Sequence, residues 1–204
     1  MSPFYCFAYL IVNFFLLITG WKVVGKENIP QDQGYIVIAN HVNLTDPALI
    51  GCAFPQQVHF LYKSEFDESP FANALFKLCG AISLRRSAAD MSALKESTHN
   101  LKRGHAVGIF PEGMRNKTEQ LLLPFEEGAV FMAYRNNVKI VPTAIINSHN
   151  TGKFWKRDVL VLIGEPFEVI VDKRHLREDL DRYNQLCYEK VLSLLKKGHG
   201  LEHK

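Results

Sequence analysis

The residues best suited to chemistry in this sequence are His41 and Asp46, which four residues separate. They lie in the segment N-H-V-N-L-T-D-P (residues 40–47), between an apolar run and a helix start that carries a proline. A carboxylate that accepts a hydrogen bond from one imidazole nitrogen fixes the tautomer and leaves the other nitrogen free to take a proton. The pair therefore predicts a general base that deprotonates a hydroxyl group. The alternative roles are an N-cap for Asp46 and a loop histidine without chemistry for His41.

A second polar group is the segment F-P-E-G-M-R at residues 110–115. Arg115 offers a planar fork of donors that suits a phosphate. Glu112 can accept hydrogen bonds from hydroxyl groups or hold the arginine in place, and Gly113 lets the backbone turn where a Cβ atom would clash. Taken alone, the segment is also compatible with a surface turn in which Glu112 pairs with Arg115.

Strands and helices alternate along the chain and position both groups. β-Branched residues in short apolar runs predict strands, and apolar residues at helical spacing predict helices. Both polar groups then follow strands, at the sheet edge where ligands of α/β proteins usually bind. The pattern predicts a single α/β domain with a largely parallel central sheet flanked by helices. The predicted strands are 35–39, 58–62, 81–84, 106–110, 139–146 and 159–163, with 167–171 as a further candidate, and the predicted helices are 46–53, 70–78, 91–103, 128–135 and 177–197.

The N-terminus differs from the rest of the chain because residues 4–20 carry no charge. A spanning helix needs about 20 apolar residues, so this run is short for a span, and no Lys or Arg precedes it as in a signal peptide. We expect residues 1–24 to form a membrane-anchoring segment, re-entrant or single-pass, ahead of a catalytic domain at 25–204. Lys22 and Lys26 would hold that domain on the cytoplasmic side. The alternative is a helix buried in the domain core.

The composition excludes several classes of function. The formal net charge of +3 is mild, and no long basic stripe or recognition module accompanies it, so we expect no nucleic-acid partner. The four cysteines lack the C-x2-C spacing of zinc sites, which favours buried thiols in a reducing compartment. Neither His41 nor Asp46 has further carboxylate or imidazole ligands at helix or hairpin spacing, so we expect no metal.

Four motifs in a fixed order resemble the glycerolipid acyltransferase family, which contains lysophosphatidic acid and glycerol-3-phosphate acyltransferases. The resemblance extends over residues 22–170, and its N-H-x4-D and F-P-E-G-x-R motifs are together highly specific. A Lys-x-Glu stretch of the family is matched as well, by Y-K-S-E-F at residues 62–66. The four motifs are N-H-x4-D at 40–46, G-x-I-x-L-x-R at 80–86, F-P-E-G-x-R at 110–115 and V-P at 141–142.

The resemblance implies direct acyl transfer without a resident cofactor, a metal or a covalent acyl-enzyme. His41 would take the proton from a glycerol-backbone hydroxyl while Asp46 orients the ring, and the oxygen would attack the thioester of acyl-coenzyme A or acyl carrier protein. The acceptor would be a membrane lysophospholipid, first of all 1-acylglycerol-3-phosphate giving phosphatidic acid, at the cytoplasmic face of the cell membrane. The residues implied in holding the acceptor are Glu112, Gly113, Arg115, Arg86 and Lys63, with Arg85 as a further candidate.

The sequence departs from the family pattern next to the acceptor loop. Glu126 and Glu127 stand where the family generally carries one or two lysines. This loss of positive charge leaves another lysophospholipid or an amphiphilic alcohol open as the acceptor.

Two rival functions also stay open. In one, the protein is a lipid hydrolase or thioesterase in which His41 activates water. In the other, it is a non-catalytic module that binds lipid through the N-terminal segment and residues 152–157. That second segment interleaves aromatic and cationic residues, which suits an anionic interface or a coenzyme A phosphate, although a strand-connecting loop with solvated charges explains it equally well.

Overall fold

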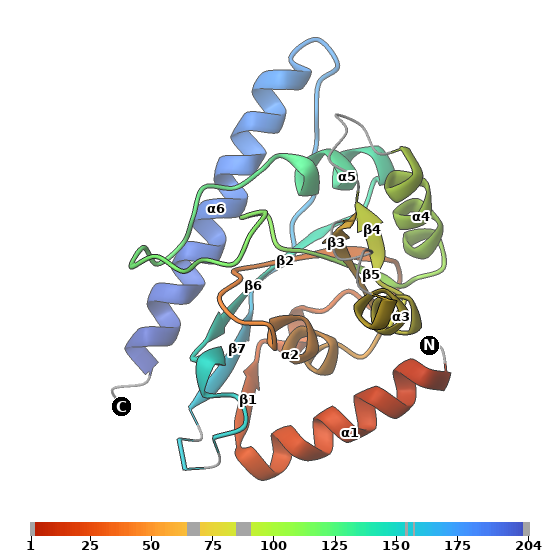
Figure 1. Ribbon diagram of the computed structural model, residues 1–204. Helices are drawn as coiled ribbons and strands as arrows, with labels where there is room; N and C mark the ends of the chain where they lie inside the picture. The colour runs from red at the N-terminus through yellow and green to blue at the C-terminus, as the bar shows by residue number, and fades with distance from the viewer. Residues whose placement is uncertain (1–2, 65–69, 85–90, 154, 157, 202–204) are drawn as a thin grey trace.

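A computed structural model describes residues 3–64, 70–84, 91–153, 155–156 and 158–201. Within these residues, seven strands form one sheet in the order β1-β7-β6-β2-β5-β3-β4 (Figure 1). Every neighbouring pair is parallel except β6 and β7, which confirms the predicted α/β domain with a largely parallel central sheet. The strands are β1 (Trp21–Val24), β2 (Tyr35–Ala39), β3 (Val58–Lys63), β4 (Ile82–Leu84), β5 (Ala106–Ile109), β6 (Ile140–Ile146) and β7 (Val159–Ile163).

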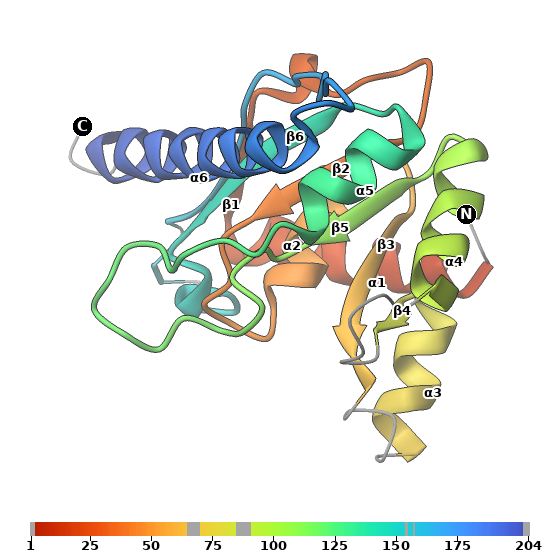
Figure 2. The same cartoon turned by 90° about the horizontal axis from the view of Figure 1, so that it is seen from above.

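Helices cover both faces of the sheet. The first two helices lie on one face, and α4, α5 and α6 lie on the other (Figure 1). A further helix, α3, lies beside β3 and β4 at one end of the sheet (Figure 2). The helices are α1 (Pro3–Thr19), α2 (Asp46–Ala53), α3 (Pro70–Leu78), α4 (Met91–Lys102), α5 (Gly128–Asn136) and α6 (Leu176–Leu201), with short 3-10 turns η1 (Lys26–Asn28) and η3 (Ser148–Asn150).

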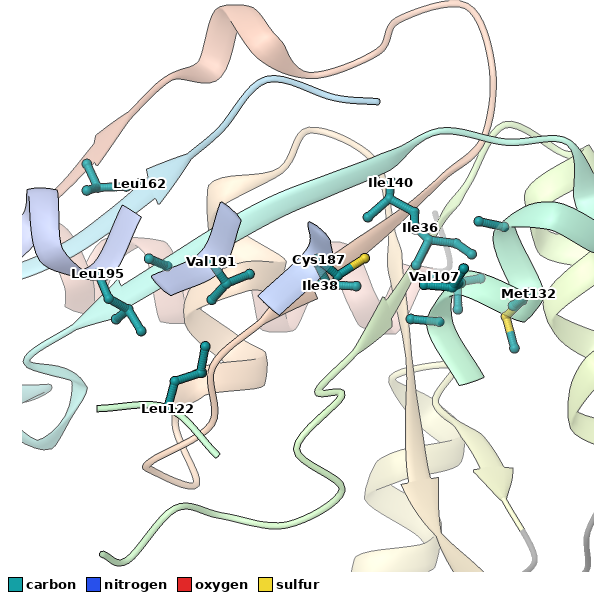
Figure 3. Packing of buried hydrophobic residues seen from close by; sticks show 14 of the residues in the cluster. Ile36, Ile38, Val107, Leu122, Met132, Ile140, Leu162, Cys187, Val191 and Leu195 are labelled. Carbon is teal, nitrogen blue, oxygen red and sulfur yellow. The ribbon is translucent and has the colours of Figure 1, made fainter. Parts of the chain in front are cut away.

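The central strand β2 is buried along its whole length because helices cover both of its faces. On one face, Ile36 and Ile38 belong to a cluster that α6 completes (Figure 3). On the opposite face, Tyr35 and Val37 pack in a cluster with residues of α2 and with Leu16 of α1. The α6 residues of the first cluster include Cys187, Val191 and Leu195.

Most predicted elements are present, and apart from the last helix their boundaries agree with the structure to within one residue. The strands at 35–39 and 159–163 and the helices at 46–53 and 70–78 agree residue for residue with the structure. The last helix is longer than predicted and extends over Leu176–Leu201. The further candidate strand at 167–171 is wrong, because only Phe167 pairs with the sheet, through an isolated antiparallel bridge to Ile140.

The predicted division at residue 24 falls at the end of a strand. Trp21–Val24 pair with β7 as the edge strand β1 of the sheet. Gly20, at φ 79°, turns the chain from α1 into this strand. The strand was missed because its four residues follow the apolar run directly, without a turn signal of several residues.

Helix α1 packs against the domain with one face and exposes the other. On the packed face, Leu16 is buried and the Tyr5 hydroxyl donates a hydrogen bond to the carbonyl of Gly51 in α2, at 3.3 Å. Among the described residues, no helix combines the length and the hydropathy needed to cross a bilayer. The large apolar side chains of α1 that remain exposed are Phe7, Leu10, Ile11, Phe14, Phe15, Leu17 and Ile18.

Candidate active site

The loop between β2 and α2 brings His41 and Asp46 into contact. Nδ1 of His41 lies 2.8 Å from Oδ2 of Asp46. The same oxygen accepts the backbone N–H groups of Val42 and Asn43, each at 2.7 Å. Because this carboxylate oxygen acts as an acceptor toward the loop, Nδ1–H of His41 donates to it as well, and Nε2 is left to take a proton. The predicted base–orienter geometry is therefore present.

Asp46 does not cap α2, contrary to the alternative role considered from the sequence. It is the first residue of the helix, and the N-cap position belongs to Thr45, whose side chain makes no capping hydrogen bond. The carboxylate is buried and faces back toward the loop, where Oδ2 serves three donors. A single N-cap bond would satisfy fewer buried donors, which explains the orientation. Its other oxygen, Oδ1, has no hydrogen-bond partner in the described part of the chain.

Aromatic stacking fixes the plane of the His41 ring. The ring lies on that of Phe110, with centroids 4.2 Å apart and an interplanar angle of 18°. Phe110 in turn stacks on Phe60 at 5.3 Å. Gly108 makes room for this stack, because a Cβ atom there would lie 2.4 Å from the Phe60 ring. The imidazole keeps 17% of its side-chain surface exposed, so a substrate can reach it from one side.

These three supporting residues were missed in the sequence analysis. The available signal was Phe110 itself, which opens the F-P-E-G motif at the end of a predicted strand. Phe60 and Gly108 carry no such local signal, since they face each other only after β3 and β5 pair.

The second loop lies beside the first because β2 and β5 are parallel neighbours (Figure 2). Ile38 lies opposite Ile109 in this pair. His41 and Glu112 each come three residues later, so both lie just beyond the carboxyl ends of their strands, side by side. The backbone N–H of His41 donates to Oε1 of Glu112 at 2.7 Å, and that of Leu123 donates to Oε2 at 2.9 Å. Glu112 thus joins three segments of the site.

Glu112 is 5% exposed, and this burial raises the pKa of its carboxyl group, while the two backbone N–H donors act in the opposite direction. Both of its oxygens already serve the protein backbone. The geometry therefore supports a positioning role for Glu112, and its predicted contact with the acceptor stays a prediction.

Gly113 and Arg115 shape the outer part of the second loop. Gly113 has φ 66°, the left-handed conformation that a side chain would disfavour, and a Cβ atom there would lie 2.5 Å from Oε1 of Glu126. The backbone N–H of Asn116 donates to the carbonyl of His41 at 2.6 Å, which holds Arg115 next to the loop that carries His41. No hydrogen bond or ion pair joins the Arg115 guanidinium to any described residue, so its donors remain available for an anionic ligand.

The remaining predicted acceptor ligands are less well placed. Lys63 ends β3, which pairs with β5, so it lies at the same edge of the sheet. Within the described ranges it forms no hydrogen bond or ion pair with the two loops. Arg85 and Arg86 lie outside the described residues.

Asn40 holds the end of β2 in place, one residue before His41. Its side-chain amide donates to the carbonyl of Ile145 in β6 at 2.9 Å, and its carbonyl oxygen accepts the N–H of the same residue at 2.8 Å. The Asn40 side chain thus takes the place of a backbone hydrogen bond between β2 and β6 and sets the point at which the His41 loop leaves the sheet.

Other chemistries find little support in the described part of the chain. No group of three or more His, Cys, Asp or Glu side chains there is arranged to hold a metal ion. Burial raises the pKa of the Cys52 and Cys187 thiols to about 12, so these groups stay protonated and are poor nucleophiles near neutral pH.

The geometry of these two loops can be compared with known proteins. The sequence model of the family described as Acyltransferase matches residues 20–146, a range that contains both loops. The 1-acyl-sn-glycerol-3-phosphate acyltransferase of Bacillus subtilis is 30% identical over 178 residues, which are 83% of this chain and 87% of that protein. The chain belongs to the acyltransferase family. The resemblance stated from the motifs is confirmed, as is the expectation of an acyltransferase enzyme.

Further relatives are matched over part of their length. The 1-acyl-sn-glycerol-3-phosphate acyltransferases of Borreliella burgdorferi and Saccharomyces cerevisiae are 30% and 34% identical over 66% and 62% of this chain. The chain spans 55% and 43% of those two acyltransferases, about half of their length. The crystal structure of the 1-acyl-sn-glycerophosphate (LPA) acyltransferase PlsC from Thermotoga maritima has the same fold, with a TM-score of 0.65 and 23% identity over 98% of this chain and 79% of that one.

Proposed function

We propose that this acyltransferase moves a fatty acyl group from an acyl thioester to the free hydroxyl of 1-acylglycerol-3-phosphate, which gives phosphatidic acid. The observation that carries the proposal is the 2.8 Å contact between His41 and Asp46, which leaves Nε2 to take a proton beside a loop whose Arg115 guanidinium has no partner among the described residues. The names of the relatives agree with this acceptor. No resident cofactor or metal takes part, and the acyl donor is acyl-coenzyme A or acyl carrier protein.

The reaction needs one proton relay. Nε2 of His41 takes the proton of the acceptor hydroxyl as its oxygen attacks the thioester carbonyl, and Asp46 stabilises the imidazolium through Nδ1–H. Collapse of the tetrahedral intermediate breaks the carbon–sulfur bond, and His41 returns the proton to the leaving thiolate. A general base of this kind contributes about 10²–10⁴-fold to the rate. Arg115 holds the acceptor phosphate through charge-assisted hydrogen bonds.

A second candidate acceptor is a lysophospholipid with a zwitterionic headgroup. The carboxylate of Glu126 lies against Gly113 in the acceptor loop, and no ion pair neutralises it within the described residues. Such a group repels a phosphomonoester and attracts the amine of an ethanolamine headgroup. Glu127, in contrast, lies beside Asp181 in α6, and this neighbouring carboxyl group raises the pKa of the Glu127 carboxyl.

A panel of acceptors with one labelled acyl thioester tests the proposal. We expect label in phosphatidic acid when 1-acylglycerol-3-phosphate is offered, and less label with glycerol 3-phosphate. If the zwitterionic acceptor is preferred, Glu126→Lys will shift the ratio of kcat/KM values toward the phosphomonoester, and Glu127→Lys will not. Free fatty acid released at a rate that no lysolipid changes would show a thioesterase instead. Lipid binding without any label, unaltered by Asp46→Asn, would show a non-catalytic module.

We further propose that the enzyme works at the cytoplasmic face of the cell membrane, with α1 lying in the plane of the interface. Both the lysolipid acceptor and the diacyl product reside in a bilayer. The exposed face of α1 carries large apolar side chains such as Phe7, Leu10 and Phe14, while its other face packs on α2. A helix that is apolar on its outer side and too short to span suits this position. Lys22 and Lys26 follow the helix on the side of the domain.

A further inference from the structure

An exposed tryptophan lies in the connection between β6 and β7. Trp155 is 68% exposed, which is unusual for the largest apolar side chain of a soluble surface. Lys153 and Lys156 flank it, and Lys156 is exposed as well. Tryptophan beside lysine is the composition found at membrane–water interfaces, where the ring lies at the level of the headgroups. We define the Trp155 loop as Thr151, Gly152, Lys153, Trp155 and Lys156.

The Trp155 loop contacts α1 on one side. A Cβ atom on Gly152 would lie 3.5 Å from the ring of Phe15, so the loop backbone rests against that side chain. Figure 1 shows the segment between η3 and β7 beside the C-terminal end of α1. The loop therefore continues the exposed apolar face of α1, which includes Phe15 itself.

On its other side the loop contacts the catalytic loop. The hydroxyl groups of Thr151 and Thr45 lie 3.4 Å apart, and the side-chain amide of Asn43 donates to the carbonyl of Ser148 at 3.2 Å. Leu44, between these two contact residues, is 69% exposed. Exposed apolar side chains thus occur on three segments that contact one another: α1, the Trp155 loop and the His41 loop, where Leu44 lies three residues after His41.

We propose that the Trp155 loop is a second membrane contact, which docks the mouth of the active site on an anionic lipid surface. The proposal rests on the proposed function, because only a membrane-borne acceptor requires the mouth to face lipid. Charge supports an anionic partner. Between residues 151 and 158 the sequence has one acidic residue, Asp158, and the side-chain amide of Asn150 donates to both of its carboxylate oxygens, at 2.9 and 3.1 Å. Lys156, in contrast, is exposed.

Fluorescence of Trp155 provides the test, because the chain has only one other tryptophan, Trp21. In a Trp21→Phe variant, the emission of Trp155 is recorded with phosphatidylcholine vesicles that contain phosphatidylglycerol and a brominated lipid. We expect a blue shift and quenching with anionic vesicles. Lys153→Gln and Lys156→Gln should each weaken partition about fivefold, since a lysine near such a surface contributes about 1 kcal/mol. Lys102→Gln, in α4 on the opposite face of the sheet, is the matched control and should not weaken it.

Three outcomes would overturn the proposal. Emission that vesicles neither shift nor quench, while the protein still sediments with them, would assign the binding to α1 alone. Lysine variants that raise the KM for acyl-coenzyme A without changing vesicle partition would assign the loop to the donor phosphate. Absence of any vesicle binding would exclude both α1 and the Trp155 loop as membrane contacts.

Acyl transfer to a short-chain, monomeric acceptor separates these failures from failure of the proposed function. Transfer that persists while Trp155 stays unquenched overturns only the loop proposal. Quenching without transfer to any acceptor overturns the proposed function and leaves the docking surface in place.

Discussion

The Asp46 carboxylate supports both the imidazole of His41 and the loop that carries it. One of its oxygens serves the ring of His41 and two backbone N–H groups of the loop. It therefore determines both the tautomer of the base and the shape of the loop that carries it. Changing this oxygen should affect the chemistry more than the binding of either substrate.

We expect Asp46→Asn to lower kcat by about 10²–10⁴-fold, because a neutral amide cannot stabilise the imidazolium that forms when His41 takes the proton. The KM values should change little. Steady-state kinetics with labelled donor, compared with the exposed control Asp32→Asn, checks this. A kcat within about threefold of wild type would show that the carboxylate does not orient the base.

Glu112→Gln distinguishes positioning from acceptor binding. The amide can accept only one of the two backbone N–H bonds that the carboxylate accepts now. A lost buried hydrogen bond costs about 1–3 kcal/mol, so we expect kcat to fall by about 10–100-fold with a near-normal KM for the acceptor. Glu119→Gln, exposed in the same connection, is the control. A large rise in the acceptor KM at normal kcat would instead place Glu112 on the substrate.

Between secondary-structure elements, the parallel pairing of β2 with β5 and of β5 with β3 assembles the site. The first pairing brings the His41 and Glu112 loops together, and the second places Phe60 over Gly108. The ring stack that supports the imidazole thus depends on three strands, and a change in the middle strand should disturb it.

We expect Gly108→Ala to destabilise the fold by about 1–3 kcal/mol, because the new methyl group would overlap the Phe60 ring and force it to move. A displaced Phe60 ring would also disturb the stack of Phe60 and Phe110 that supports the His41 ring. The acyl-transfer rate of the folded variant should therefore fall as well. Urea unfolding and kinetics on the same sample measure both. Gly128→Ala, at a helix start with open space around it, is the control and should be neutral or slightly stabilising. Equal unfolding midpoints for the two variants would contradict the packing argument.

Local signals explain which elements the sequence predicted correctly. Pro47 and Pro70 mark helix starts, and Gly80 and Gly104, both at positive φ, mark helix ends. The features that were missed depend on contacts between distant residues. The direction of the Asp46 side chain depends on buried donors of its own loop, the ring stack depends on strand order, and β1 becomes a strand only through its pairing with β7. The N-H-x4-D and F-P-E-G-x-R loops could be predicted together because each follows a recognisable strand.

For the protein as a whole, a histidine pair at the start of β3 and β5 couples stability to pH. Nδ1 of His59 lies 2.7 Å from the carbonyl of Gly80, and its Nε2 lies 3.0 Å from Nδ1 of His105. Burial lowers the pKa of both imidazoles, and their mutual proximity lowers that of His59 further. The folded state therefore favours the neutral rings.

The free energy of unfolding should thus be fully retained above the unfolded-state pKa of about 6.5 and should decrease as the pH falls below it. We expect His105→Gln to reduce this acid-side loss, because the half-buried imidazole whose pKa the folded state lowers is then absent. Urea midpoints between pH 7.5 and 5 measure the slope. His175→Gln, at an exposed site, should leave the slope as in wild type. A slope that neither variant changes would exclude the pair as its source.

The most direct test of the central claim is the acyl-transfer rate of His41→Gln, with labelled acyl thioester and 1-acylglycerol-3-phosphate. The account predicts that kcat falls by about 10²–10⁴-fold, which is the contribution of a general base, while the unfolding midpoint stays close to that of wild type. Turnover of the folded variant within about threefold of the wild-type rate would contradict it.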